Sequence, residues 1–343
     1  MNVDITIGIP VYRAADYIRN TLLSALEQTY PNVEILVVDD CGGDGSMQVV
    51  CELQQTHWRG ACIRILRNDC KRGVGATRNR IVDEARGSYL YFLDSDDVIE
   101  PNTLQLLMDA ALQSQAEVVY ASYEVVDKVN GTPPRAYRKP SLQLTGPNAL
   151  AEYSFKHQSV FQITVCNCLV QMDFLRATGV RFIDAMFWED MAFTYELVTK
   201  VNRSVLLPDI TYHYLCRPGS LSNYQDREIL NKEEIQRNAT IINYLKSKCS
   251  VLKGKPYLAY YCNVLQVNSF YIVCHIWKRA THIVPRYTYR ELRQIMRHPL
   301  PLATVLRFRH KLVGNLGFWL LGRLPIPLFV ALFWIIGKLK RAL

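Results

Sequence analysis

Aspartates gather at two places in this 343-residue chain, each directly after a strand-like run. Asp39 and Asp40 follow one run, and Asp94, Asp96 and Asp97 follow another. A single acidic pair after a strand is usually a helix cap or a solvated turn. Two acidic clusters at neighbouring strand ends repel each other unless a cation or hydrogen-bond donors compensate the charge. Such carboxylates, with substrate phosphates completing the coordination shell, favour a site for Mg²⁺ or Mn²⁺.

A further acidic pair, Glu189-Asp190, begins a helical pattern directly after Phe187 and Trp188. An acidic pair at the start of a helix is by default a cap. The two aromatic neighbours should exclude part of the water, and this raises the pKa of a carboxyl group toward that of a useful general base. The pair is therefore a candidate for proton abstraction.

The elements that must position these residues alternate between short apolar runs and amphipathic segments over the first 123 residues. This alternation predicts a doubly wound α/β sheet, in which ligands bind beyond the carboxyl ends of the strands. The expected strands are Val3–Ile9, Val33–Val38, Cys62–Leu66, Tyr89–Leu93 and Val118–Tyr123. The expected helices are Tyr17–Gln28, Val74–Arg86 with Gly87 as its C′ residue, Pro101–Ser114, Pro147–Lys156 and Glu189–Lys200. From about Asp226 the pattern is almost wholly helical.

Two known classes of α/β protein share part of this pattern, and other features of the sequence exclude both. A response-regulator receiver domain also has an acidic pair after a strand, but here a strand and a helix come first. Glu124 follows the last strand where a receiver needs a lysine, and Lys128 lies too far along the chain. A nucleotidyltransferase acting on sugar phosphates needs a glycine-rich loop after the first strand, and the segment from Pro10 to Arg13 cannot supply one.

From Ile5 to about Asn223 the sequence resembles the family 2 glycosyltransferases, an inverting group with a GT-A fold. Each matching piece is weak alone, but the ordered set is specific. The pieces are Ile9-Pro10-Val11-Tyr12, Ser24-x-x-x-Gln28-Thr29-Tyr30-Pro31, Glu34-x-x-Val37-Val38-Asp39-Asp40, Gly73-x-x-x-x-Arg78-Asn79, Ala85-x-Gly87-x-Tyr89, Phe92-Leu93-Asp94-Ser95-Asp96-Asp97, Glu189-Asp190 and Arg217-x-Gly219-Ser220.

The resemblance implies a nucleotide-sugar donor, with UDP favoured as its nucleotide, and assigns residues to it. Pro10 and Tyr12 would contact the base, and Asp40 would accept a hydrogen bond from the uracil imide. Asp94, with Ser95 beside it, would bind the ribose. Two arginines complete the donor set, Arg78 in the pocket wall and Arg217 at the leaving diphosphate. The alternative for Arg78 is a helix-surface residue paired to Asp83 or Glu84.

The resemblance also assigns the metal and the base. Asp96 would hold the Mg²⁺ or Mn²⁺ that bridges both phosphates. Asp97 either shares this metal or caps the next helix, and the cap is favoured. Asp190 would be the general base, with Glu189 as its neighbour. His213 is a weaker candidate for the diphosphate or metal, and a histidine satisfied within a strand is the alternative.

The C-terminal region combines positive charge with apolar character. Residues 270–343 contain 13 Lys and Arg residues but one acidic residue, Glu291. Within them, residues 324–337 form a run of 14 residues without a charge. A spanning helix needs roughly 20 residues, so an interfacial helix on an anionic membrane surface is favoured over a span, and over nucleic-acid binding. Residues 312–343 would supply this contact, with Phe329, Leu332, Phe333 and Trp334 inserted. The alternative is a terminal helix pair packed on the folded core.

The composition bounds the remaining expectations. The N-terminus has no basic and apolar leader pattern, and the ten cysteines show no metal-ligand spacing, so the cytosol is the expected compartment. We expect a nucleotide-sugar-binding half at residues 1–123, an acceptor-side half at 124–225 and a helical region at 226–343. The chain would sit peripherally on the cytoplasmic face of the inner membrane.

The resulting hypothesis is a metal-dependent inverting glycosyltransferase that glycosylates a hydroxyl of a glycan or lipid-linked glycan. One alternative is a polyprenyl-phosphate glycosyltransferase, whose ionised acceptor needs little general base. Another is a non-catalytic, membrane-attached sugar-nucleotide binding protein.

Overall fold

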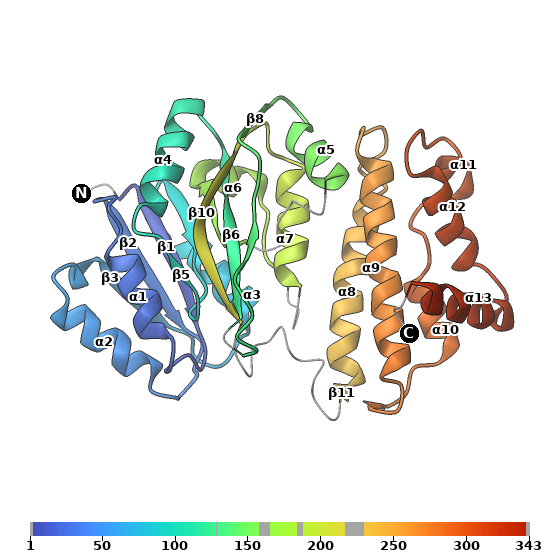
Figure 1. The fold of residues 1–343 in the computed structure, drawn as a ribbon, viewed down its shortest axis with the longest axis horizontal. Coiled ribbons are helices and arrows are strands. Elements are labelled where there is room, and N and C mark those ends of the chain that lie inside the picture. Colours follow the sequence, from blue (N-terminus) through green and yellow to red (C-terminus); the bar gives the residue numbers. More distant parts are fainter. Residues whose placement is uncertain (1–2, 128, 158–164, 184–187, 217–229, 341–343) are drawn as a thin grey trace. The chain divides into compact units, whose positions relative to one another are not determined.

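The computed structural model describes residues 3–127, 129–157, 165–183, 188–216 and 230–340. The chain divides into two compact units (Figure 1). Unit 1 comprises residues 1–184 and 189–220, and unit 2 comprises residues 185–188 and 221–343. The residues proposed above for the donor, the metal and the base belong to unit 1. One of them, Arg217, lies outside the described residues.

Unit 1 is built on one mixed sheet with the strand order β3-β2-β1-β4-β9-β6-β10-β5. Strands β3, β2, β1 and β4 run parallel, β9 is antiparallel to β4 and β6, and β10 is parallel to β6. The short strands β7 and β8 pair with β6 and β10. The strands are β1 Ile5–Val11, β2 Val33–Asp39, β3 Ile63–Arg67, β4 Tyr89–Phe92, β5 Val98–Ile99, β6 Val118–Asp127, β7 Arg135–Tyr137, β8 Leu142–Thr145, β9 Cys168–Gln171 and β10 Arg203–Cys216. The predicted α/β class is confirmed.

From β1 to β4 the helices of unit 1 alternate with the strands along the chain, as the sequence pattern of the first 123 residues predicts. The helices of unit 1 are α1 Ile18–Leu26, α2 Ser46–Thr56, α3 Val74–Glu84, α4 Thr103–Ser114, α5 Ala149–Lys156, α6 Met172–Thr178 and α7 Glu189–Val198. Helix α3 packs on β1 and β2, and α4 packs on β6, β9 and β10. The parallel strands β1, β2 and β4 are buried along their length because helices cover them, which explains their near-continuous apolar runs.

Two local predictions were wrong. Gly87 is not a C′ glycine, because α3 ends at Glu84 and the following Ala85 is already extended. Gly87 instead lies so close to β1 that a Cβ atom would stand 2.5 Å from the backbone nitrogen of Thr6. Asp97 is not a helix cap, because α4 begins at Thr103, beyond the two-residue strand β5.

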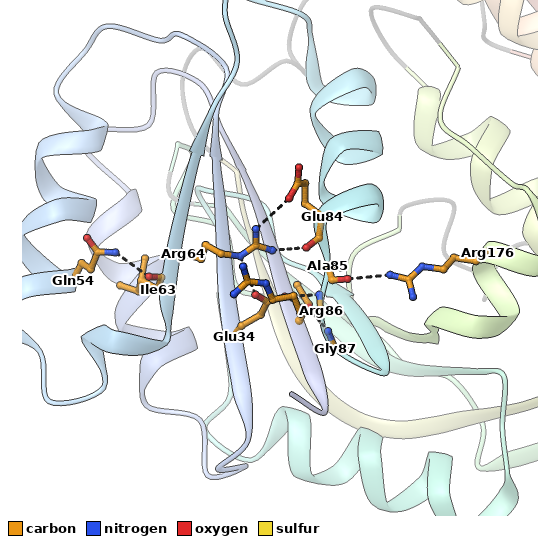
Figure 2. Close-up of polar contacts among 10 residues, drawn as sticks. Glu34, Gln54, Ile63, Arg64, Glu84, Ala85, Arg86, Gly87 and Arg176 are labelled. Atoms are coloured by element: carbon orange, nitrogen blue, oxygen red, sulfur yellow. Dashed lines mark hydrogen bonds and ion pairs between the residues drawn. The ribbon is translucent and has the colours of Figure 1, made fainter. Parts of the chain in front are cut away.

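Glu34 joins three strands and the connection into a fourth at the amino ends of β1–β4. Its carboxylate accepts hydrogen bonds from the Thr6 hydroxyl (2.6 Å), the Arg86 backbone N–H (2.7 Å) and Arg64 Nε (3.1 Å). Figure 2 shows Arg64 reaching on to Glu84, at the end of α3. Because Glu34 and Thr6 are buried, the Thr6 hydroxyl depends on this carboxylate as its acceptor, whereas Arg64 also pairs with Glu84.

Unit 2 consists of helices, with one short two-stranded sheet, β11–β12. Helices α8 and α9 lie side by side, and α10, α12 and α13 contact one another or α9 (Figure 1). The elements are β11 Leu230–Asn231, α8 Lys232–Lys248, α9 Leu258–Lys278, β12 Ile283–Val284, α10 Tyr289–Ile295, α11 Leu302–Val305, α12 Leu312–Leu321 and α13 Ile326–Leu339. None of the helices in the described ranges has the length and apolar character to cross a bilayer.

Helix α13 has a buried face and an exposed face. Phe333 is 0% exposed and stacks on Trp277 of α9, with ring centroids 5.5 Å apart, while Phe270 and Phe329 complete the cluster. The expectation that Phe329 and Phe333 insert into a membrane was therefore wrong, since both are core residues of unit 2. On the other face, Leu332 is 41% and Trp334 is 50% exposed. Only one face of the apolar run of α13 is therefore buried in the core of unit 2.

We predict that Glu34→Ala lowers the free energy of unfolding by about 3 kcal/mol, because it leaves a buried hydroxyl and a backbone amide without their acceptor and removes one of the two carboxylates that pair with Arg64. Urea unfolding followed by circular dichroism measures this loss. The control is Glu52→Ala, which removes the exposed ion pair with Arg19 and should cost less than about 1 kcal/mol. Equal losses for the two variants would contradict the structural role given to Glu34.

We predict that Phe333→Ala lowers the free energy of unfolding by about 3–5 kcal/mol, the usual cost of a large cavity in a core. Its neighbour Leu332, which points away from that core, provides the matched control. Leu332→Ala should change stability by less than about 0.5 kcal/mol. If both variants melt like the parent chain, α13 is not part of the folded core.

Candidate active site

The acidic turn after β4 divides its carboxylates between different partners. Asp94 forms an ion pair with Arg78, with Oδ1 2.7 Å from Nη2. Asp97 is buried and accepts hydrogen bonds from the Tyr212 hydroxyl (2.5 Å) and the Leu215 backbone N–H (2.8 Å), both from β10. Burial raises the pKa of Asp97 well above its usual range, and the charges of Asp96 and Asp94 add to this. Asp97 therefore anchors the acidic turn to β10. It does not have the helix-cap role that had been expected for it.

Asp96 is the half-buried carboxylate between these two anchored positions. Within the described part of the chain, no three His, Cys, Asp or Glu side chains form a group that could hold a metal ion alone. The Asp96 carboxylate is compatible with Mg²⁺ or Mn²⁺ only together with substrate phosphates, because such cations bind through one or two carboxylates when phosphates supply other ligands. A cation here would be held by Asp96 and completed by a diphosphate.

Asp40 holds the loop of residues 68–73 from the carboxyl end of β2. Its oxygens accept hydrogen bonds from Asn68 Nδ2 (2.8 Å) and from the backbone N–H groups of Arg72 (2.7 Å) and Gly73 (2.9 Å). Asp39 has a local role, accepting a hydrogen bond from the Cys41 backbone N–H at 2.9 Å. Asp40 is thus a structural acceptor for a loop at the edge of the sheet where ligands bind.

Tyr12 follows β1 at the same edge, and Pro10 is a buried residue of β1 itself. The ammonium of Lys71, in the loop that Asp40 holds, lies 4.2 Å from the centroid of the Tyr12 ring. The guanidinium carbon of Arg13 lies 5.3 Å from the same centroid. The half-buried ring therefore attracts cations to its π system, a contact that sequence reasoning had not identified.

Arg78 lies at the junction between the acidic turn and helix α7. Its Nη1 is 2.6 Å from Glu189 Oε1, and its Nη2 is 2.7 Å from Asp94 Oδ1. The alternative of a surface arginine paired to Asp83 or Glu84 was wrong. Asp83 pairs with another arginine, Glu84 pairs with Arg64, and the Arg78 side chain is 6% exposed.

Glu189 and Asp190 form the first turn of α7, with Glu189 buried and Asp190 half-buried. Asp190 Oδ1 accepts a hydrogen bond from the Met191 backbone N–H at 2.7 Å. Burial and the adjacent Glu189 charge raise the pKa of Asp190 to about 7, against the opposing effect of Arg78. The pKa of Asp190 is thus shifted in the direction expected from the sequence, and of the two aromatic neighbours expected to cause the shift, Phe187 lies outside the described residues.

Three further residues were candidates from the sequence: His213, Ser95 and Arg217. His213 on β10 is held between Glu100 (2.7 Å) and Glu124 (2.9 Å), so both ring nitrogens already face carboxylates. Ser95 is buried beside Asp94. Arg217 lies outside the described residues, so its expected position at a diphosphate has no structural counterpart here.

Asn79, next to Arg78, has a positioning role that sequence reasoning missed. Its side chain donates to the Phe182 carbonyl (2.8 Å) and accepts from the Phe182 backbone N–H (2.9 Å). The available signal was the Arg78-Asn79 pair itself, in which only the arginine had been given a role.

Residues 6–178 match the sequence profile described as glycosyl transferase family 2. The chain belongs to this family. It is a family of transferases, and the fold and the order of the acidic motifs agree with this membership.

Named relatives extend the comparison. The succinoglycan biosynthesis protein ExoO of Rhizobium meliloti is 29% identical over 224 residues, which cover 64% of this chain and 62% of ExoO. The UDP-Glc:alpha-D-GlcNAc-diphosphoundecaprenol beta-1,3-glucosyltransferase WfgD of Escherichia coli is 32% identical over 123 residues, covering 36% of this chain and 47% of WfgD. The chain thus spans less than two thirds of either relative.

Among solved structures, residues 1–349 of TarS from S. aureus, in complex with UDP-GlcNAc, superpose with a TM-score of 0.64. The identity is 17%, and the match covers 93% of this chain and 90% of the TarS chain. At this identity the similarity shows the fold, and it confirms the fold expected from the resemblance.

Proposed function

We propose that this chain transfers a sugar from a UDP-sugar to a hydroxyl of a glycan or lipid-linked glycan, with inversion at the anomeric carbon. The observation that carries the proposal is the buried bridge from Asp94, in the acidic turn, through Arg78 to Glu189, beside Asp190. In this proposal the bridge connects the acidic turn, where Asp96 would hold a cation on the donor diphosphate, to Asp190, whose pKa is raised. The name of WfgD, with a UDP-Glc donor and a lipid-linked GlcNAc acceptor, supports the choice of substrates.

The donor would lie along the carboxyl ends of β1, β2 and β4. In this proposal Tyr12 stacks on the base and displaces the Lys71 ammonium, while Pro10 lines the wall behind it. Asp40 Oδ2 accepts one hydrogen bond, from the Gly73 backbone N–H, so this oxygen can accept a second one from the uracil imide N–H. Asp94 and Ser95 would bind the ribose, and Arg217 the diphosphate.

Bound Mg²⁺ or Mn²⁺ would neutralise charge that develops on the leaving diphosphate. Asp96 is the protein ligand in this proposal. The neighbouring anchors of Asp94 and Asp97 fix the backbone of the turn, and so determine where the Asp96 carboxylate can point.

Asp190 acts as the base. As the acceptor oxygen forms its bond to the anomeric carbon, the bond from that carbon to the diphosphate oxygen breaks on the opposite face. The hydroxyl proton passes to the Asp190 carboxylate. A pKa of about 7 makes this group a better proton acceptor than an ordinary aspartate while leaving much of it ionised near neutrality.

Attachment to an anionic membrane is the remaining part of the proposal, with the chain peripheral on the cytoplasmic face of the inner membrane. The exposed side chains of the last two helices include Val313, Leu320, Leu328, Leu332, Trp334, Ile335 and Leu339. Lys311, Arg323 and Lys338 are exposed among them. Exposed apolar side chains together with exposed basic residues in the same two helices and the segments beside them fit the interface of an anionic bilayer.

We predict that Asp190→Asn abolishes transfer, by roughly a thousandfold or more in kcat, while UDP affinity measured calorimetrically stays near that of the parent chain. In the parent chain, kcat/KM should fall as the pH drops below about 7, because the raised pKa of Asp190 is then crossed and the base is protonated. An active Asp190→Asn enzyme would instead favour an ionised lipid-phosphate acceptor.

We predict that Asp96→Asn reduces turnover by several orders of magnitude and that excess EDTA has the same effect on the parent chain, since both remove the cation. Nucleotide release with added Mg²⁺ or Mn²⁺ is the assay, and a melting curve establishes that the fold is intact. Full activity in EDTA would exclude the metal at Asp96.

We predict that the chain sediments with vesicles containing phosphatidylglycerol and is only partly released by high salt, because salt screens charge but not apolar insertion. Replacing Leu332 and Ile335 together by glutamate should weaken vesicle binding at least about tenfold. Val251→Glu, at a 78% exposed position in unit 2 outside α12 and α13, is the control. Binding that the double variant leaves unchanged would exclude α13 as the contact.

A further inference from the structure

Two adjacent residues of α3 hold the segment that leads into α7. Asn79 pairs through both polar atoms of its side chain with the backbone of Phe182, and Arg78 pairs with Glu189 at the first position of α7. Gly75, one turn earlier on α3, allows this approach, because a Cβ atom there would lie 3.0 Å from the Ile183 carbonyl oxygen and 3.4 Å from Glu189 Cγ. Helix α3 therefore determines where α7 begins.

The charges at this contact are removed from water. The side chains of Arg78 and Glu189 are 6% and 7% exposed, and the Arg78 guanidinium also lies over the Phe182 ring. A buried carboxylate without a cation would be protonated or displaced. Both terminal nitrogens of Arg78 already face carboxylates, Asp94 and Glu189, so the guanidinium is oriented by the protein itself.

We propose that Arg78 is a positioning residue for the base, which fixes ionised Glu189 and with it the turn that carries Asp190, instead of acting on the donor. This inference rests on the proposed function of Asp190. It differs from the role that the family resemblance suggests, in which Arg78 contacts the donor directly.

The bridge also sets the electrostatic surroundings of Asp190. Among the described residues, the charged groups that act on this carboxylate are Glu189 on its own helix, Arg78 on α3 and Asp94 after β4. Glu189 and Asp94 raise the pKa of Asp190, and Arg78 lowers it. Removing Arg78 should therefore move the acidic limb of the pH–rate profile to higher pH, and removing the Glu189 charge should move it to lower pH.

The experiment compares Arg78→Met, Glu189→Gln and the double variant in the full chain. For each, kcat/KM is measured against pH, UDP affinity by calorimetry, and Tm by thermal unfolding. Arg78→Lys is included because it keeps a charge but lacks the planar fork that presents separate donors to the two carboxylates in a fixed geometry. The matched control is Arg181→Met, which removes the exposed ion pair of Arg181 with Asp83 between the same two segments.

We expect Arg78→Met to lose at least roughly a hundredfold in kcat with UDP affinity changed less than about threefold. The acidic limb should move in opposite directions in the two single variants. In the double variant it should return toward the parent position, with a Tm above that of Arg78→Met. Arg181→Met should leave the pH profile unchanged. If Arg78→Met does not fold, the test rests on Glu189→Gln, whose acidic limb must move to lower pH, and on Arg78→Lys, which must lose kcat with UDP binding retained.

A tenfold or greater loss of UDP affinity with an unmoved limb would overturn the proposal and make Arg78 a donor ligand. A lower Tm with an unmoved limb, or Tm losses of the two single variants that simply add in the double variant, would also overturn it and leave only a structural role. Failure of the base assignment is distinguishable, because Asp190→Asn would then be active, while the Tm values of the three Arg78 and Glu189 variants still report whether the pair is coupled.

Discussion

The arrangement of the acidic groups depends on one buried cation. Arg78 faces two carboxylates from segments far apart in the chain, and a third, Asp190, lies within its electrostatic reach. Carboxylates in such a dry place do not stay ionised together without a positive partner. The planar guanidinium offers separate donors to each, which a lysine ammonium cannot do with the same geometry. The position of that guanidinium comes from the sheet, because α3 lies so close to β1 that Gly8 has Ile81 where a side chain would be.

Much of the fold could be predicted from local pattern. The strands β1, β2 and β4 are near-continuous apolar runs, and their ends fell within two residues of the predicted ones. Gln28, part of the motif that follows the first helix, shows why such motifs mark the fold. Its amide nitrogen donates to the Ser24 and Glu100 carbonyls, and its oxygen accepts from the Leu104 N–H at the start of α4. The motif therefore holds backbone together and carries no chemistry of its own.

What could not be predicted depends on contacts distant in sequence. Asp97 looked like a cap because its partners on β10 are 115 and 118 residues further along the chain. Arg78 was assigned to a pocket wall or a helix surface, because its link to Glu189 spans 111 residues and has no local signature. In α13 the composition is apolar on every side, so no periodicity separates Phe333, which meets Trp277, from Leu332, which does not. Only the packing distinguishes the two faces.

The place of Glu34 in the sheet has a consequence for how this chain can change over evolution. Thr6, Glu34 and Arg64 are each the second residue of their strand, so the charged network that fastens β1, β2 and β3 lies at the edge opposite the acidic residues. The network that fastens these strands and the acidic residues proposed to act on substrate therefore lie at different ends of the same strands. Loops at the carboxyl edge can accumulate substitutions, insertions and new specificities without loosening this network. Divergent descendants of such a scaffold could acquire different sugars or acceptors while the opposite edge stays under selection for folding alone.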